Sequence, residues 1–473
     1  MTERIKADIC VIGAGSGGLS VAAGAAQMGA RAVLVEGAEM GGDCLNTGCV
    51  PSKALLAAAS AAEAQRSGAR FGVTRVEPQA DYAAAMEHVA ATIAAIAPHD
   101  SQERFESLGV RVIRAWGRFT SPSDLAAGDA VITARRFVIA TGSRPFVPPI
   151  PGLETVPYLT NETLWSLRER PARLLVIGGG PIGMELAQAH RRLGCEVTVI
   201  EAATALNRED PELAAILLDR LRAEGVEIVA GAKVASVTGQ GGAIRVEVEG
   251  GRTFEGTHLL VAAGRVPNTE SLNLDAAGVE TNKSGIRTDA RLRTTNRRIY
   301  AIGDVAGRGQ FTHLAGYHAG VVVRSAVLGL PARARHDHIP RATYTDPELA
   351  HVGLTEAEAR KRHGDKLTVL RAPLSANDRA QATARTEGMV KVMAVGGRPV
   401  GVSIVGTEAG ELIAPWALAM ANGLKLSAFA NTVLPYPTLS EASKRAASTY
   451  FTPKLFDNPW VKRVVGFVQR FIP

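Results

Sequence analysis

Residues 9–36 and residues 174–201 of this chain repeat the same pattern, without a gap, at an offset of 165 residues. Each stretch begins with an apolar run, continues through a G-x-G-x-x-G turn into a helical segment, and closes with a second apolar run that ends in Glu36 or Glu201. Each is therefore predicted to be a βαβ unit. Two such units predict an α/β chain with two Rossmann-like domains.

The glycines of the two turns indicate what these units bind. They allow a tight bend, close approach of the backbone to a pyrophosphate and close packing of helix on strand, while the helix N-terminus faces the anion. The closing glutamate is placed to accept hydrogen bonds from ribose hydroxyls. A single copy of this motif is weakly diagnostic, but two copies in the same context predict two dinucleotide sites. The turn glycines are Gly13, Gly15 and Gly18 in the first unit and Gly178, Gly180 and Gly183 in the second.

Residues 41–53, just after the first unit, contain Cys44 and Cys49. In a regular α-helix, residues five apart have Cα atoms about 8–9 Å from one another, beyond the ~7 Å limit for a disulfide, so a bridge requires Cys44 to lie outside regular helix. Neighbouring glycines permit this distortion, and Pro51 suits the first turn of a helix running through Lys53. Cys49 near that helix N-terminus, with Lys53 four residues on, favours a thiolate. We predict a redox-cycling disulfide; the alternative is two ordinary free thiols in a buried loop.

Composition narrows the class further. A chain of 473 residues is expected to form two to four domains. Its apolar runs are far shorter than the ~20 residues of a membrane span and no signal peptide precedes the first strand, so a cytoplasmic location is expected. With only four cysteines, a bridge in a reducing compartment is more often catalytic than structural. The net charge of +7 is dispersed over a long chain, which favours solvated surface, so a nucleic-acid partner is not expected. No residue is assigned to a resident metal ion.

The cysteine segment, with its glycines and Pro51-Ser52-Lys53, resembles the signature of the flavin-dependent pyridine nucleotide-disulfide oxidoreductases. Runs at residues 137–145, 260–265, 298–304 and 434–441 extend the resemblance over nearly the full chain. It implies two Rossmann-like dinucleotide-binding domains, a C-terminal α+β dimerisation domain and a homodimer. The implied bounds are 1–150 for the first part of the FAD-binding domain, 151–268 for the NAD(P)-binding domain, 269–337 for the second part of the FAD-binding domain, and 338–473 for the dimerisation domain.

The same resemblance assigns the cofactors. FAD belongs to the first unit, because only that unit runs directly into the cysteine segment. The pyridine nucleotide belongs to the second, where the charge of Glu201 would repel a 2′-phosphate and so favours NADH over NADPH, although Arg208 nearby would weaken this discrimination. The further cofactor-binding residues that it implies are Gly42, Lys53, Thr141, Gly142, Gly264 and Asp304, the last of which hydrogen-bonds the ribityl chain.

The family pattern also implies roles for individual side chains. Cys49 lies against the flavin as the charge-transfer thiolate, and Cys44 is the interchange thiol that meets the substrate. Lys53 and Glu185 match an ion pair near the flavin. The implied activity is electron transfer from NADH, through the flavin and the disulfide, to a small dithiol/disulfide or lipoyl-type substrate, as in dihydrolipoamide dehydrogenases.

One position departs from that pattern. Disulfide reductases of the family place a histidine before the Pro-Thr segment near the C-terminus and a glutamate five residues later, whereas this chain has Tyr436 and retains Glu441. A tyrosine, with a pKa of about 10, is a poor general base at neutral pH. Tyrosine there is reminiscent of mercuric reductases, which reduce a thiolate-bound metal ion, but no C-terminal cysteine pair follows Cys195. Three functions stay open: reduction of a disulfide substrate, reduction of a soft metal ion, and sensing of NADH with little turnover. His313 and His318 are candidate replacements for the base.

Four other segments have readable patterns. Residues 54–64 and 82–96 have helical spacing and are predicted to be packing helices beside the flavin. Residues 121–130 are predicted to form a hairpin or turn region. In the tail, residues 459–472, apolar side chains gather on one side of a predicted helix and basic ones largely elsewhere, a pattern compatible with peripheral contact with an anionic membrane surface. The alternative is that this apolar stripe packs within the protein's own dimer.

Overall fold

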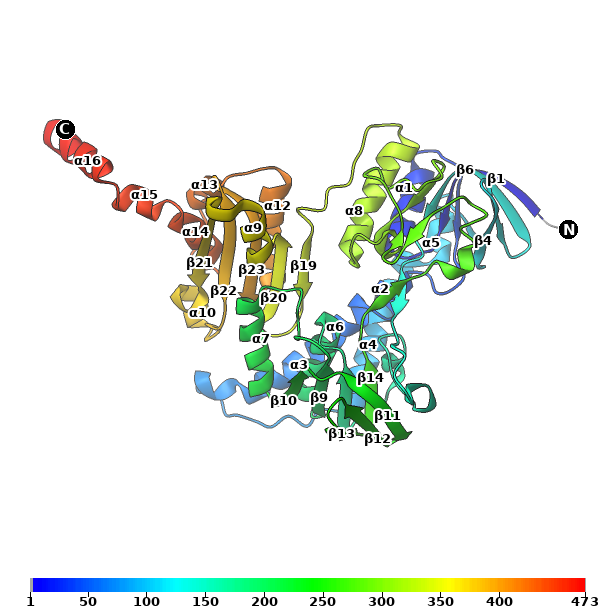
Figure 1. The fold of residues 1–473 in the computed structure, drawn as a ribbon, viewed down its shortest axis with the longest axis horizontal. Helices are drawn as coiled ribbons and strands as arrows, with labels where there is room; N and C mark the ends of the chain where they lie inside the picture. The colour runs from blue at the N-terminus through cyan, green and yellow to red at the C-terminus, as the bar shows by residue number, and fades with distance from the viewer. Residues whose placement is uncertain (1–2, 473) are drawn as a thin grey trace. The chain divides into compact units, whose positions relative to one another are not determined.

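The computed structural model of the protein describes residues 3–472, and its internal contacts divide the chain into two units (Figure 1). Unit 1 contains the chain up to Ser67, Arg75–Ala203 and Glu227–His336. Unit 2 contains Gly68–Thr74, Thr204–Val226 and the chain from Asp337 on. Both dinucleotide-binding repeats and the cysteine segment therefore lie in unit 1.

The first repeat lies in a seven-stranded sheet with the order β3-β2-β1-β6-β5-β4, in which β18 also pairs with β6. Strand β1 contributes Cys10 and Ile12 to the core on one face and Ile9 and Val11 to the core on the other, as expected for a parallel sheet covered on both sides. The parallel strands are β1 (Glu3–Ile12), β2 (Ala32–Val35), β3 (Arg111–Ile113), β6 (Ala130–Ile139) and β18 (Ile299–Ala301).

The antiparallel edge of this sheet and its helices also agree with the sequence. Strands β4 (Gly117–Ser121) and β5 (Asp124–Ala127) form successive hairpins that lead into β6, which confirms the hairpin predicted at residues 121–130. Helices α3 (Cys49–Arg66) and α4 (Tyr82–Ile96) contain the two predicted helical segments. The Asp81 side chain caps α4 by accepting a 3.0 Å hydrogen bond from the Ala84 N–H, which explains why the helix begins there.

The second repeat forms a sheet with the order β10-β9-β8-β14, and α6 (Pro181–Arg192) follows its glycine turn. Strand β8 (Arg173–Ile177) pairs in parallel with β9 (Glu196–Glu201) and with β14 (His258–Val261). The other strands here are β10 (Val226–Ala230) and the antiparallel trio β11 (Val234–Gln240), β12 (Ala243–Val248) and β13 (Thr253–Gly256). A short antiparallel pair, β7 (Ser143–Pro145) with β15 (Arg265–Pro267), connects the two repeats.

Unit 2 is built on a five-stranded antiparallel sheet. Trp416 is fully buried there, where it stacks on Phe429 with ring centroids 3.8 Å apart and donates a 3.0 Å hydrogen bond to Ser443 Oγ. An antiparallel sheet with helices packed on it is the α+β architecture predicted for the C-terminal region. In sheet order the strands are β19 (Pro340–Thr343), β20 (Glu348–Gly353), β23 (Arg398–Gly406), β22 (Met389–Val395) and β21 (Leu367–Pro373), and the packed helices are α12 (Ala414–Ala421), α13 (Leu426–Asn431) and α14 (Ser440–Thr449).

Helix α7 (Pro211–Ala223) belongs to unit 2 although its sequence lies within the range predicted for the NAD(P)-binding domain. Lys391 of β22 is buried, and its Nζ lies 2.8 Å from Asp210 Oδ2 and 2.7 Å from both Glu212 Oε2 and Glu356 Oε2. A buried ammonium needs such carboxylate partners, so the segment that supplies Asp210 and Glu212 is held to this sheet. The predicted domain bounds themselves stay predictions.

The two turn glycines of the second repeat differ in what surrounds them. A Cβ at Gly183 would lie 2.1 Å from the Gly178 carbonyl oxygen, whereas a Cβ at Gly180, whose φ of −79° suits alanine, meets no atom within 4 Å. We expect Gly183→Ala to lower the free energy of unfolding by about 1–3 kcal/mol or more, as overpacking does. Gly180→Ala should cost less than about 1 kcal/mol, the effect of alanine at a helix N-cap. Urea unfolding followed by fluorescence measures both.

The first repeat supplies a matched pair. A Cβ at Gly18 would lie 1.9 Å from the Gly13 carbonyl oxygen, while a Cβ at Gly15 would meet no atom within 4 Å. We therefore expect Gly18→Ala to lower the free energy of unfolding more than Gly15→Ala does. Equal losses of stability within either pair would contradict the close helix-on-strand contact.

Candidate active site

The cysteine segment folds as two separate helices. Cys44 lies in the short helix α2 (Gly42–Asn46), and Cys49 is the first residue of α3. Thr47 (φ −140°) and Gly48 (φ −118°, ψ −109°) break the helical path between them. The prediction that Cys49 lies near a helix N-terminus is confirmed. The expectation that Cys44 lies outside regular helix was wrong, because Cys44 is helical. Its helix is nevertheless distinct from the one that contains Cys49.

Two glycines bring this segment onto the first glycine turn. Gly41 adopts a left-handed φ of +87° and donates a 3.0 Å hydrogen bond from its N–H to the Ala14 carbonyl. A Cβ at Gly42, which has φ +61°, would lie 2.8 Å from the Gly15 Cα. Backbone therefore touches backbone, which only glycine permits at these positions. The start of α2 is consequently fixed against the turn of the first dinucleotide unit.

The two thiols are free, and each perturbs the pKa of the other. The hydrogen bond from Cys44 lowers the pKa of Cys49 to about 6, helped by a contact with Thr312 Oγ1 at 3.4 Å and by the charge of Lys53, while burial opposes the shift. The same hydrogen bond and burial raise the pKa of Cys44. At neutral pH the pair thus carries one proton and one negative charge, with the thiolate on Cys49.

Lys53 lies one helical turn after Cys49, on the same face of α3. Its Nζ is 2.8 Å from Glu185 Oε2, and the Glu185 side chain on α6 is only 7% exposed. The structure thus brings together the two residues that the family resemblance paired. This ion pair joins a helix of the first repeat to a helix of the second, and it keeps a positive charge beside the thiolate.

A second polar chain runs from the cysteine segment to the end of β18. Arg265 Nη2 lies 3.2 Å from Asp43 Oδ2, and the same guanidinium donates to Ser143 Oγ at 2.8 Å and to the Ser143 carbonyl at 2.7 Å. Ser143 Oγ in turn donates a 2.6 Å hydrogen bond to Asp304 Oδ2, and burial raises the pKa of that carboxyl. Asp43, Ser143 and Arg265 were not singled out from the sequence. The only sequence signal for each of them is that it lies next to a predicted site residue.

The two glutamates that close the repeats make the same pair of hydrogen bonds. Glu36 accepts from the Ala14 N–H at 2.5 Å and from the Ala38 N–H at 2.6 Å. Glu201 accepts from the backbone N–H groups of Gly179 and Ala203, at 2.7 and 2.8 Å, which are the equivalent positions 165 residues later. Each carboxylate is thereby held at the end of its strand beside the glycine turn. Two oxygens provide about four acceptor sites, so acceptor capacity remains for ribose hydroxyls.

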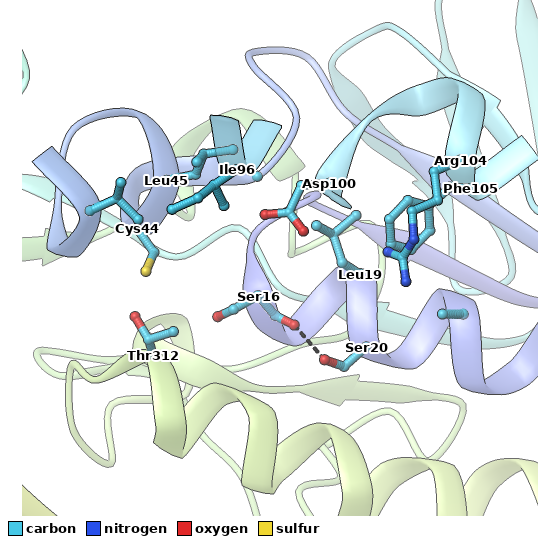
Figure 2. Close-up of a pocket in the computed structure, with 13 residues that line it drawn as sticks. Ser16, Leu19, Ser20, Cys44, Leu45, Ile96, Asp100, Arg104, Phe105 and Thr312 are labelled. Atoms are coloured by element: carbon cyan, nitrogen blue, oxygen red, sulfur yellow. Dashed lines mark hydrogen bonds between the residues drawn. The ribbon is translucent and has the colours of Figure 1, made fainter. Parts of the chain in front are cut away.

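A pocket of about 380 Å³ opens beside the first glycine turn. Figure 2 shows Cys44 and Thr312 pointing toward one another at its edge, with Ser16 of α1 (Ser16–Gln27) close by. Thr312 begins α8 (Thr312–Val322), so residues of α1, α2 and α8 lie at this edge of the pocket. Cys44 and the N-terminus of α1 therefore face the same space.

The glycine turn of the first repeat and the loops beside it fit FAD. A Cβ at Gly15 meets no atom within 4 Å, so the space outside the turn accepts a pyrophosphate, and Gly142 (φ +65°) is equally open. Thr141 holds the adjoining loop, because its Oγ1 donates to the Asn268 carbonyl at 2.7 Å. Asp304 offers a buried carboxylate on the same unit. The second repeat shows the same open space at Gly180 and at Gly264 (φ +130°), which fits a second dinucleotide.

Tyr436 and Glu441 belong to unit 2 and make local contacts there. The Tyr436 side chain is 71% exposed, and its hydroxyl donates a 2.7 Å hydrogen bond to Asp378 Oδ2, which raises the pKa of the tyrosine. Glu441 Oε2 accepts a long hydrogen bond of 3.4 Å from the Thr438 N–H. A tyrosine hydroxyl bound to a carboxylate is held protonated, so it serves as a donor and not as a base.

The two histidines of α8 have different surroundings. His318 is fully buried, and burial lowers its pKa to about 4. Its Nδ1 accepts a 3.2 Å hydrogen bond from the Gly303 N–H, and its Nε2 lies 3.0 Å from His336 Nε2. A neutral ring with both nitrogens engaged positions the backbone next to Asp304, which is a structural role. His313 stacks on Phe311, with ring centroids 5.3 Å apart.

We expect the reduced protein to react with iodoacetamide at Cys49, at a rate that falls as the pH drops through about 6, because only the thiolate is nucleophilic. Cys44→Ala removes the largest cause of the lowered pKa and should move this transition toward the ordinary thiol value of about 8.5. Mass spectrometry of alkylated peptides measures it. Cys195 is buried and serves as the internal control, and an unchanged profile in Cys44→Ala would contradict the shared proton.

Among residues 3–472, no helix is long and apolar enough to cross a membrane. The chain matches two family models: residues 7–319 match the pyridine nucleotide-disulphide oxidoreductase model, and residues 339–447 match the dimerisation domain of the same family. It is 37% identical to a mercuric reductase of Lysinibacillus sphaericus over 452 residues, which cover 94% of this chain and 82% of the relative. It is also 37% identical to a dihydrolipoyl dehydrogenase of Thermus scotoductus over 463 residues, which cover 93% and 96%.

A solved structure extends the likeness to the fold. The HOCl-induced flavoprotein disulfide reductase RclA of Escherichia coli superposes with a TM-score of 0.83 at 29% identity, over 93% of this chain and 99% of that one. The family model alone spans more than half of the chain. The protein therefore belongs to the pyridine nucleotide-disulphide oxidoreductases and is an FAD-dependent NAD(P)H oxidoreductase with the dimerisation domain of that family.

Proposed function

We propose that the protein transfers two electrons from NADH to a small disulfide substrate through Cys44 and Cys49. The observation that carries this proposal is the arrangement of the thiol pair. Cys49 begins α3 with Lys53 one turn away and has a lowered pKa, and Cys44 lines the pocket beside the first glycine turn. In the proposed roles, Cys44 is the interchange thiol and Cys49 the thiolate beside the flavin. Bound FAD supplies the path for two electrons between the nicotinamide and the disulfide.

The proposed disulfide exchange has two steps. Cys44 Sγ attacks one sulfur of the substrate, the substrate S–S bond breaks, and the first thiol leaves. Cys49 Sγ then attacks Cys44, the second thiol leaves, and the Cys44–Cys49 bond forms. NADH supplies the two electrons and the hydrogen that return the pair to one thiol and one thiolate. The net change is NADH, a disulfide and one proton converted to NAD⁺ and two thiols.

A soft metal ion is the second candidate acceptor, and the hydrogen bond of Tyr436 to Asp378 favours it. Disulfide exchange needs a group that protonates the leaving thiolate and deprotonates Cys44, which a tyrosine held protonated does poorly. A divalent soft ion M²⁺ instead displaces the proton of Cys44, binds both sulfurs and leaves as M⁰ after taking two electrons from NADH, which restores the thiol and thiolate. Relatives of both kinds, mercuric reductase and dihydrolipoyl dehydrogenase, resemble the chain.

The roles of the other site residues are proposals of the same kind. Lys53 and Glu185 hold the charge beside the flavin, Glu36 and Asp304 bind FAD, and Glu201 binds the nucleotide ribose. The match to the dimerisation domain supports a homodimer. By the family pattern, Tyr436 and Glu441 of one subunit then complete the site of the other. The predicted cytoplasmic location stays a prediction.

We expect kcat/KM for NADH to exceed that for NADPH by roughly 5- to 150-fold, the range of an unfavourable charge contact of about 1–3 kcal/mol. The cause is the Glu201 carboxylate, which its hydrogen bonds to Gly179 and Ala203 hold at the end of β9. Steady-state kinetics with both nucleotides measure the ratio. Glu201→Gln keeps the size of the side chain but removes the charge, so it should narrow the ratio, and a wild type without preference would contradict the assignment.

A panel of lipoamide, glutathione disulfide, Hg(II) and quinones as acceptors for NADH tests the proposed function, and it separates turnover from a sensor that turns over little with any of them. We expect weak lipoamide turnover in the wild type and a gain of at least about tenfold in Tyr436→His, since general-base catalysis typically contributes about 10²–10⁴-fold. Tyr436→Phe, which removes the hydroxyl without adding a base, is the control and should show no gain. High lipoamide turnover that Tyr436→Phe leaves intact would exclude the role given to this position.

A further inference from the structure

The C-terminal helix of unit 2 separates apolar from basic side chains. Helix α16 spans Pro459–Phe471, and it begins where the Asn458 side chain accepts a 2.9 Å hydrogen bond from the Trp460 N–H, with proline at the first helical position. At 100° per residue, the apolar residues fall in one continuous sector and the polar ones in the opposite sector. After Pro459 at the first position, the apolar sector contains Trp460, Val461, Val464, Val465, Phe467, Val468 and Phe471; the polar sector contains Lys462, Arg463, Gly466, Gln469 and Arg470.

The described part of unit 2 leaves the apolar sector in solvent. Trp460 is 70% exposed, Phe467 is 60% exposed and Phe471 is 62% exposed. The helix is drawn at the end of the chain beyond α14 and α15 (Thr452–Phe456), where it extends away from the sheet of its own unit (Figure 1). A helix of 13 residues is marginal in water without a surface on which to bury its apolar side.

The charge around the stripe indicates what that surface is. Residues 442–472 contain six basic residues and a single acidic residue, Asp457. Two copies of α16 packed through their stripes would cover the apolar sector but would leave Lys462, Arg463 and Arg470 on the outer faces, where the second copy supplies no negative charge. An anionic bilayer supplies both an apolar layer and negative charge, and Trp460 suits the interface between them. The helix is about 20 Å long, too short to span the ~30 Å of a bilayer core, so it would lie in the plane.

We propose that α16 binds the surface of an anionic lipid bilayer, with its apolar sector among the acyl chains and its basic residues at the headgroups. This contact holds the dithiol enzyme at a membrane surface. The proposal concerns a surface of unit 2 and does not rest on the acceptor proposed above, so either can fail without the other.

Flotation of the full-length protein with vesicles tests the proposal. We expect binding to vesicles of equal parts phosphatidylglycerol and phosphatidylcholine, weaker binding at high salt, and little binding to phosphatidylcholine alone. Phe467→Gln should weaken binding by about 10- to 100-fold, because one buried aromatic side chain is lost. Gln469→Ala, on the polar sector, is the matched control and should bind as the wild type does.

Variants of the basic residues test the electrostatic part of the binding independently. Lys462→Gln combined with Arg463→Gln should weaken binding to anionic vesicles by about fivefold for each charge. NADH-dependent dye reduction in solution should stay unchanged in all of these variants, which shows that they are folded. No binding to anionic vesicles by the wild type, or equal binding by Phe467→Gln and the wild type, overturns the proposal. Self-association of the wild type that Phe467→Gln abolishes, without vesicle binding, would instead assign the stripe to a second copy.

Discussion

The contact of backbone on backbone at Gly42 and Gly15 determines where the redox chemistry of this enzyme takes place. A Cβ at Gly42 would lie 2.8 Å from the Gly15 Cα, and the Gly41 N–H bonds the Ala14 carbonyl, so α2 begins directly against the dinucleotide turn. Cys44, two residues into α2, therefore reaches the pocket at the N-terminus of α1. The break in the helical path at Thr47 and Gly48 separates the cysteines into two helices. A disulfide between residues five apart requires such a break.

Charges then decide which sulfur carries the negative charge. Cys49 receives the hydrogen bond from Cys44, begins α3 and has Lys53 one turn away, and all three effects favour its thiolate. Lys53 is itself held by the buried Glu185 of α6, so the second repeat takes part in setting the charge at the cysteine pair. On the other side, Asp43 next to Cys44 is paired with Arg265, which limits how far its negative charge disturbs the site.

Much of this arrangement could be predicted from the sequence, because it follows from local patterns. The glycine turns, the closing glutamates, the two helices after the cysteines and the α+β character of the C-terminal region each depend on neighbouring residues. The pair of Arg265 with Asp43 joins residues far apart in the chain that no shared motif connects, and the attachment of α7 to unit 2 through Lys391 is of the same kind. The sequence also offered His318 as a base, whereas burial and the Gly303 hydrogen bond give it a structural role.

The number of protons on the thiol pair connects the site to the choice of electron acceptor. The pair holds one proton, so reduction of a disulfide takes up one more proton from solvent, whereas binding of a divalent soft ion releases the proton that Cys44 holds. The first process needs a group that moves protons to and from Cys44, and the second does not. Tyr436, hydrogen-bonded to Asp378 with its pKa raised, donates without accepting. In the proposed function, the cysteine segment therefore sets how electrons leave the enzyme, and the residue at position 436 sets which acceptors can take them at a useful rate.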